Sequence, residues 1–304
     1  MIVMLLILMM IFLSIAAYLF RFSVIEFVKP TSHFLHQLCL STVPELLQHK
    51  ESAQALICGK NFSSAEQSSL WVSSGLIHLF VVSGTHLNFI SLNLNRLQLP
   101  TLLSTTFLFL YCLVCQMNAP VVRSFLFITL TVVLKKNILY WPKDRTLLIA
   151  SLFCTILNPE WITSLSFLMS WLAALILMIQ TQNNSDDSAL NGQILFYLGF
   201  SFCFSQFGFP TGAIVLFAVL LAPFLEKILF PLALSLILIP ALCPLFDGLI
   251  NAIQKIIVLL ELNKQLPQQN QLNLLLMNGV IILSIHIYLF YFPTEPNNKP
   301  REAL

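Results

Sequence analysis

Long apolar segments make up most of this chain, and short polar or proline-containing stretches separate them. Residues 2–20 are almost wholly apolar, and 272–292 form a similar segment toward the other end. A helix needs about 20 apolar residues to cross the hydrocarbon core of a bilayer. The pattern predicts an all-α fold: a polytopic transmembrane helical bundle with broken or re-entrant helices and about eight to ten membrane segments. We expect 2–20 to be a retained transmembrane helix, because it lacks the basic start and short apolar core of a signal peptide.

Prolines and polar residues mark the expected helix boundaries. We expect helices over 100–117 and 120–134. Residues 146–157 are apolar but short for a span at 1.5 Å rise per residue. Because Asn158-Pro159-Glu160 then interrupts the chain, we expect a half-span helix followed by a full span over 161–180.

The interval between residues 21 and 70 is more polar. Apolar positions spaced along 34–47, interrupted by Pro44, predict short helices that lie at the membrane interface. Gly59 indicates the end of a helix, because glycine readily adopts the left-handed cap conformation.

Composition places the chain in the membrane class. Hydrophobic residues make up 58% of the sequence and charged residues only 9%, and the mean hydropathy is +0.86. A soluble domain typically carries about 25% charged residues, so a chain this poor in charge would aggregate in water. The net charge of +2 is too small to indicate a protein that coats nucleic acid. Lys135, Lys136, Lys143 and Arg145 lie in one short loop, which predicts that this loop is cytoplasmic.

Polar side chains interrupt the apolar segment 74–88. It carries His78 and His86 with serines, a threonine and an asparagine, and Ser83-Gly84 at its centre weakens a helix. Ionisable side chains at membrane depth cost roughly 2.5–3.5 kcal/mol for the charged types, so they usually face a bundle interior or a pathway. On one helix the two histidines lie roughly 80° apart and share a broad face. They either pack the bundle through backbone hydrogen bonds or line a hydrophilic path.

Arg123 is another polar residue within an apolar segment, in the first turn of the helix expected over 120–134. Its guanidinium either reaches the lipid headgroups or contacts a phosphate or a buried partner, and the sequence leaves both open. Two histidines do not make a zinc site, which takes three or four ligands. Cys112 and Cys115 form a CxxC inside an apolar helix, which is typical of packing. We expect no metal and no cofactor.

An intramembrane serine protease of the rhomboid type is the enzymatic alternative. Ser83 would be its nucleophile, activated by a histidine from another helix and assisted by oxyanion donors. The rhomboid pattern has a glycine two residues before the serine, where this chain has Val81, and the later segments offer only His286 as a base. We therefore expect no catalytic residues and a protein that is not an enzyme.

Residues 75–86, with the sequence GLIHLFVVSGTH, resemble the signature of the ComEC/Rec2 competence family, the inner-membrane channel proteins of natural transformation. Phe80 and Thr85 replace leucines of the family pattern. Weaker blocks follow in the family's order, so that the resemblance covers about 33–260. These blocks are Cys58-Gly59-Lys60, Val122-Arg123-Ser124, the basic loop 135–145, Leu157-Asn158-Pro159 with Ser166–Ser170 after it, and Phe207-Gly208 to Pro223.

The resemblance implies a multi-pass channel-type protein of the inner (plasma) membrane that takes up single-stranded DNA into the cytoplasm. Its implied partners are single-stranded DNA, the lipid bilayer, and a separate DNA receptor, nuclease and helicase or ATPase. We expect a transmembrane helix and linker over 1–30, the competence channel domain over 31–262, and a transmembrane helix with a disordered tail over 263–304. The family's OB-like and nuclease domains are expected to be absent, so a degenerate, non-transporting scaffold remains a further alternative.

The residues expected to line the path or its gate combine polar groups with helix breakers. Ser83-Gly84 would supply a break, the histidines and serines a wettable wall, and Arg123 a phosphate contact. The full set is Gly75, His78, Ser83, Gly84, His86, Arg123, Pro159 and Ser170.

Overall fold

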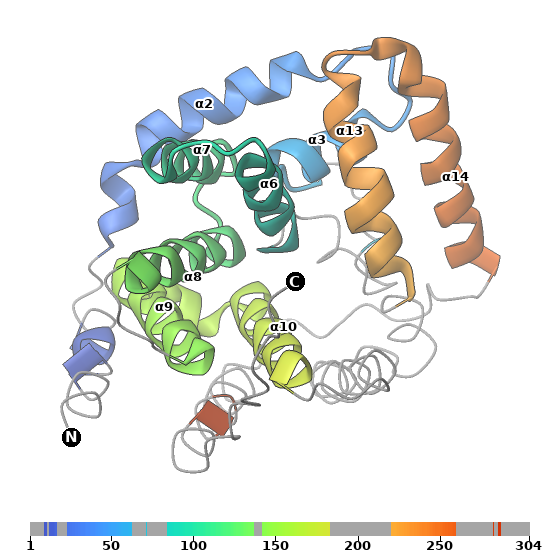
Figure 1. The fold of residues 1–304 in the computed structure, drawn as a ribbon. Helices are drawn as coiled ribbons and strands as arrows, with labels where there is room; N and C mark the ends of the chain where they lie inside the picture. The colour runs from blue at the N-terminus through green and yellow to red at the C-terminus, as the bar shows by residue number, and fades with distance from the viewer. Residues whose placement is uncertain are drawn as a thin grey trace.

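Helices account for all the regular secondary structure in the part of the chain that the structure describes (Figure 1). This computed structural model describes residues 9–10, 12–16, 23–62, 71, 84–136, 142–182, 220–259, 282 and 285–286. The all-α class predicted from the sequence is confirmed for these residues.

Three helices lie between residues 24 and 58, and a disulfide joins two of them. They are the 3-10 helix η1 (Val24–Phe27) and the α-helices α2 (Lys29–Thr42) and α3 (Lys50–Cys58). Cys39 in α2 is bonded to Cys58 in α3, with the two Cα atoms 5.9 Å apart. The next residue, Gly59, has a left-handed φ of 73°, and its N–H donates to the carbonyl of Ala55. The helix stop predicted at this glycine is therefore confirmed.

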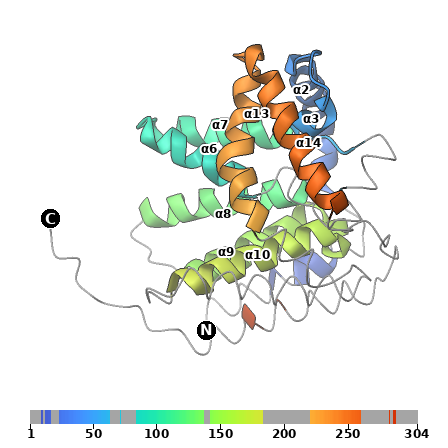
Figure 2. The ribbon, with the colours of Figure 1, turned by 90° about the vertical axis from the view of Figure 1, so that its right-hand side faces the viewer.

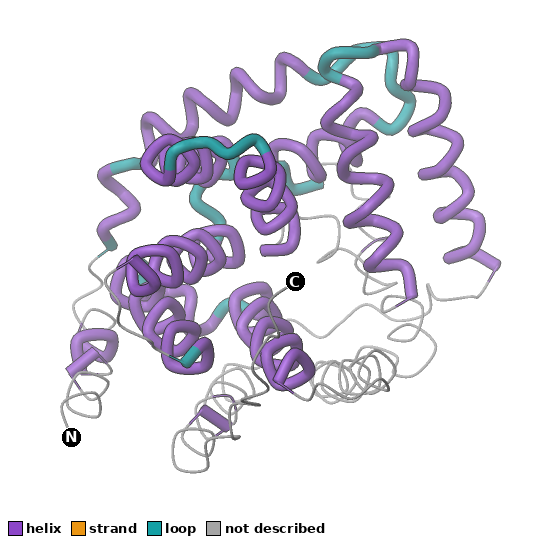
Figure 3. Tube along the Cα trace, viewed as in Figure 1, coloured by secondary structure: helices purple, strands orange, loops and turns teal. Residues whose placement is uncertain are grey.

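The central helices follow the apolar segments of the sequence. They are α6 (Gly84–Arg96), α7 (Thr101–Val114), α8 (Ala119–Lys136), α9 (Lys143–Leu157), the 3-10 helix η2 (Pro159–Thr163) and α10 (Leu165–Gln182). Short loops join α6 to α7 and α7 to α8 (Figure 3). The predicted interruption after α9 is present, because Asn158 is extended and its side chain accepts a hydrogen bond from the N–H of Glu160, which caps η2.

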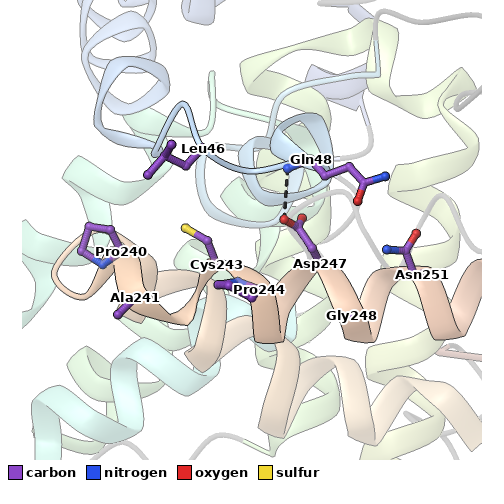
Figure 4. A pocket seen from close by; sticks show the side chains of 9 residues that line it. All are labelled: Leu46, Gln48, Pro240, Ala241, Cys243, Pro244, Asp247, Gly248 and Asn251. Carbon is purple, nitrogen blue, oxygen red and sulfur yellow. Dashed lines mark hydrogen bonds between the residues drawn. The ribbon is translucent and has the colours of Figure 1, made fainter.

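The helix α14 (Cys243–Leu259) is hydrogen-bonded to the turn that precedes α3. The elements of this region are the π-helical turn η3 (Leu225–Leu229), α13 (Phe230–Leu236), the 3-10 turn η4 (Pro240–Leu242) and α14. The carboxylate of Asp247 in α14 accepts hydrogen bonds from the backbone N–H groups of Gln48 and His49, at 3.0 and 2.9 Å. A pocket of about 560 Å³ lies beside this contact (Figure 4). Asp247 thus fixes α14 to the turn that leads into α3, whose N-cap residue His49 makes no side-chain capping bond.

Buried apolar side chains gather in two separate cores. The first core lies among α6, α7, α8, α9 and α10, which we call the first bundle. The second lies among α3, η3, α13 and α14, which we call the second bundle, and includes Trp71. Figure 2 shows α13 and α14 running steeply across the direction of α8 and α9. The described chain is thus built from two packed units rather than from one continuous core.

Helix α2 lies across the two bundles (Figure 1). Its residue Leu35 packs against the first core and Leu40 against the second. The Nδ1–H of His36 donates to two carbonyl oxygens, that of Val114 in α7 at 2.9 Å and that of Cys58 in α3 at 3.1 Å. Because both acceptors are carbonyls, Nδ1 carries the proton. α2 therefore links the ends of α3 and α7.

One described helix is long and apolar enough to cross a membrane. This stretch, Pro240–Leu259, has 20 residues. Its most apolar 18 residues have a mean hydropathy of 1.6, and 28% of them are buried within the protein. Three shorter apolar helices cover Thr101–Val114, Ala119–Leu134 and Ser166–Met178. The larger number of spans expected from the sequence stays a prediction.

Candidate functional site

Arg123 and Ser170, two residues of the predicted path, are in direct contact. The side chain of Arg123 extends from α8 and is only 4% exposed. Its Nε and Nη2 both donate to the hydroxyl oxygen of Ser170 in α10, at 3.1 and 3.0 Å. Nη2 also donates to the hydroxyl of Ser124 at 3.1 Å, and that hydroxyl donates to the carbonyl of Pro120 at 2.9 Å. The fold thus brings together two predicted positions that lie 47 residues apart in the sequence.

The guanidinium of Arg123 retains an unused donor. Its Nη1 is buried and has no hydrogen-bond partner in the part of the chain that the structure describes. Within that part, no carboxylate forms an ion pair with Arg123. A buried cation without a counter-charge is costly, and the planar fork of arginine suits carboxylate and phosphate oxygens. An anionic group that reached Nη1 would therefore gain a charge-assisted hydrogen bond.

Gly84 brings α6 into close contact with this group. A Cβ placed on Gly84 would overlap the hydroxyl oxygen of Ser124 and would lie 3.1 Å from its Cβ and 3.3 Å from Nη2 of Arg123. A side chain at this position would require either the Ser124 hydroxyl to rotate away or α6 and α8 to shift. The predicted residue Gly84 thus lies directly against the Arg123–Ser170 pair, for a steric reason.

His86 lies on the same helix and is covered by an aromatic ring. It is 2% exposed, and its imidazole centroid lies 4.2 Å from the ring centroid of Phe230 in α13, with the rings tilted by 31°. Phe89 meets the same phenylalanine edge to face at 5.7 Å. His86 therefore faces the protein interior, and it contacts a ring from the second bundle.

A family model for competence proteins matches residues 56–295, well over half of the chain. The chain belongs to the competence protein family. The resemblance noted at residues 75–86 and in the later blocks is thereby confirmed. No curated protein and no solved structure matches the chain.

In this competence protein the matched region contains the first bundle, the second bundle except residues 50–55 of α3, and every described residue of the predicted path. Pro159 is buried at the start of η2, where its fixed φ suits the first helical position. Gly75, His78 and Ser83 lie outside the described residues, so their part in the path stays a prediction. The same holds for the nucleophile of the protease alternative. His286, the base of that alternative, accepts a hydrogen bond from the indole N–H of Trp171 at 2.9 Å.

Two residues of this competence protein's site region, and one disulfide outside it, were not predicted from its sequence. Ser124 was recognised only as part of a family block, although it contacts both Arg123 and the position of Gly84. Phe230 is one of 26 phenylalanines, and no local pattern distinguishes it. The Cys39–Cys58 disulfide could have been predicted, because both cysteines lie in the more polar interval between residues 21 and 70.

Proposed function

We propose that this competence protein is a multi-pass protein of the inner membrane that conducts single-stranded DNA into the cytoplasm, with no catalytic step of its own. The observation that carries the proposal is the family match over residues 56–295, which supports a role in DNA uptake. The contacts of Arg123 supply the chemical argument. A separate DNA receptor, nuclease and helicase or ATPase would act with it.

Outward-facing apolar side chains support a bilayer environment. Leu102 on α7 is 81% exposed and Leu259 on α14 is 80% exposed, and Phe107 and Val258 are also exposed on these helices. Large apolar side chains exposed on two helices are compatible with contact with lipid. The apolar helix stretch Pro240–Leu259, of which only 28% is buried within the protein, presents apolar side chains to the same environment.

Two independent rules give the same orientation in the membrane. Disulfides persist in oxidising compartments, so the end of the protein that carries Cys39–Cys58 would face outward. The side-chain amide of Asn118, just before α8, donates to the carbonyl of Gly59 at 3.5 Å, which places the start of α8 at that end. α8 has 18 residues, about 27 Å, and ends at Lys136 in the basic loop. That loop would then be cytoplasmic, as the positive-inside rule requires.

The group around Arg123 has the chemistry to hold a phosphodiester. Single strands are bound through cationic groups that follow the backbone and through stacking of bases on aromatic rings, worth about 1–3 kcal/mol per base. Nε and Nη2 of Arg123 are fixed by Ser170 and Ser124, which leaves Nη1 for a phosphate oxygen. A strand passing α6 and α8 would thus meet one positioned cation.

The test is uptake of labelled DNA by cells in which the gene is deleted and then restored with defined variants. Deletion should abolish uptake, and the unaltered gene should restore it. Loss of a hydrogen bond to a charged group costs about 1.5–3 kcal/mol, so Arg123→Gln should lower uptake roughly 10- to 100-fold. Arg96→Gln is the matched control, because Arg96 is exposed at the end of α6.

Protein level and fold must be equal in all strains. Membrane abundance and the Cys39–Cys58 disulfide, seen as a mobility difference on a non-reducing gel, report on both. Uptake that persists at the normal rate after gene deletion would overturn the proposed function. Normal uptake with Arg123→Gln at full abundance would remove Arg123 from the path.

A further inference from the structure

A single aromatic residue lies between the two cores. Phe230 is fully buried, yet it belongs to neither buried cluster, whereas its neighbour Leu229 and the nearby Ala233 both belong to the second. Its ring contacts His86 and Phe89, which lie on α6 of the first bundle. We call the boundary between the two bundles at these three residues the seam. Ring contacts thus join the two bundles at the seam.

The backbone immediately before Phe230 departs from regular α-helix geometry. The π-helical turn Leu225–Leu229 ends immediately before Phe230, and Pro231 follows it directly. π-helical turns are frequent at functional sites, and a proline within a helix removes one backbone hydrogen bond. Because Leu229 is the last residue of this turn, a change in the turn would move Leu229 and the ring of Phe230 together relative to α6.

The Arg123 group lies beside the seam. Gly84, which packs against Ser124 and Arg123, is two residues from His86 on α6, about 3 Å along the helix axis. A strand moving along the seam would therefore present a phosphate to the guanidinium while a base reached the rings. A flat, unpaired base can stack on an aromatic ring whatever its identity.

We propose that single-stranded DNA passes along the seam, and that Phe230 closes it against His86 and opens it by exchanging this ring contact for stacking on a nucleobase. The proposal rests on the proposed function and adds to it the location of the path and the residue that gates it. The ring pair is the closed state. The ligand of the open state is any base of a single strand, so the gate has no sequence preference.

Reversible cross-linking of the seam tests the gate. In one strain His86→Cys is combined with Phe230→Cys, and a short thiol-reactive linker with a cleavable disulfide joins the two positions. The matched control combines Phe109→Cys with Phe125→Cys, an aromatic pair with ring centroids 5.8 Å apart in which both residues lie in the first bundle. Each strain is compared with itself before linkage, after linkage, and after cleavage by a reductant.

The unlinked seam strain should already take up less labelled DNA than the unaltered protein, because it lacks the ring of Phe230. Linkage across the seam should lower its uptake at least tenfold further, and cleavage should restore the level seen before linkage. Linkage of the control pair should leave uptake unchanged. Should Phe230→Cys combined with His86→Cys reach the membrane poorly, Phe89→Cys with Phe230→Cys gives a second pair across the same seam. Unchanged uptake with the seam linked would overturn the gate and leave the proposed function intact, because the latter depends on the effect of gene deletion.

Substitutions of Phe230 test whether its ring acts by stacking on a base or only by filling space. Phe230→Leu keeps an apolar side chain but removes the flat face, so uptake should fall about 5- to 150-fold if 1–3 kcal/mol of stacking is lost. Phe230→Trp keeps an aromatic face and should retain uptake within about threefold of the unaltered protein. Equal uptake by the two variants, at equal abundance, would overturn the stacking role.

Discussion

Replacement of Gly84 by alanine tests the closest helix contact of the site. The added Cβ would overlap the Ser124 hydroxyl and press on the Ser124 Cβ and the Arg123 guanidinium, 3.1 and 3.3 Å away. The hydroxyl is held by its bond to the carbonyl of Pro120 at 2.9 Å, and the guanidinium by Ser170, so neither can move away freely. Either the Ser124 hydroxyl gives up these bonds, or α6 and α8 separate.

The expected loss of stability follows from the cost of overpacking. Inserting one methyl group into a packed interior typically costs about 1–3 kcal/mol. Ser124→Ala alone removes one buried hydrogen bond to a backbone carbonyl and one from Arg123, at about 0.5–1.5 kcal/mol each. In the double variant Gly84→Ala/Ser124→Ala the overlap with the hydroxyl is gone. Its loss of stability should therefore be smaller than the sum of the two single-variant losses by about 1 kcal/mol or more.

Titration with a denaturing detergent in mixed micelles, followed by tryptophan fluorescence, gives the free energy of unfolding of each variant. Gly248→Ala is the matched control, because a Cβ at this exposed glycine of α14 meets nothing within 4 Å. Alanine is favoured over glycine in a helix by about 0.5–1 kcal/mol, so this control should be neutral or stabilising. If Gly84→Ala behaves like Gly248→Ala, or if the double variant is simply additive, the steric reasoning is wrong.

Three further changes test other parts of the structure. Cys39→Ser removes the disulfide and should lower the free energy of unfolding by about 2–4 kcal/mol, measured by the same titration. The unaltered protein under reducing conditions should show the same loss. Ser170→Ala removes the shared acceptor of two Arg123 donors and should cost about 1.5–3 kcal/mol of stability; a loss under 0.5 kcal/mol would contradict the bonds seen here. Gly59→Ala forces a Cβ into left-handed backbone and should cost roughly 1–2 kcal/mol, so a stabilised variant would refute this assignment.

Helix positions were predictable where the sequence itself carries a local signal. The apolar segments gave α7 and α8 to within a few residues, and Gly59 and Asn158 ended helices as their backbone preferences require. α9 begins at Lys143, three residues before the expected start at 146, because the polar residues 143–145 are also helical. Such end positions depend on backbone capping, which hydropathy does not measure.

The path residues were predictable only as candidates. Polar groups within apolar segments pointed to Arg123, Ser170 and His86, and the structure brings the first two into contact. It places His86 against Phe230, a residue without any local signal. Helices that are apolar on nearly every face carry little periodicity to show which face turns inward, so contact partners could not be read from spacing.

The sequence by itself determined the helical class, the membrane-type composition, the main helix interruptions and the family. Each of these depends on properties that are local along the chain: hydropathy summed over a segment, proline and glycine backbone preferences, and a contiguous motif. Only the tertiary structure decided that there are two cores, that a disulfide joins α2 to α3, and that Arg123, Ser124, Ser170 and Gly84 form one group. These features depend on how each helix is rotated and how closely its neighbours approach, and lipid and protein interior favour the same apolar residues on every face.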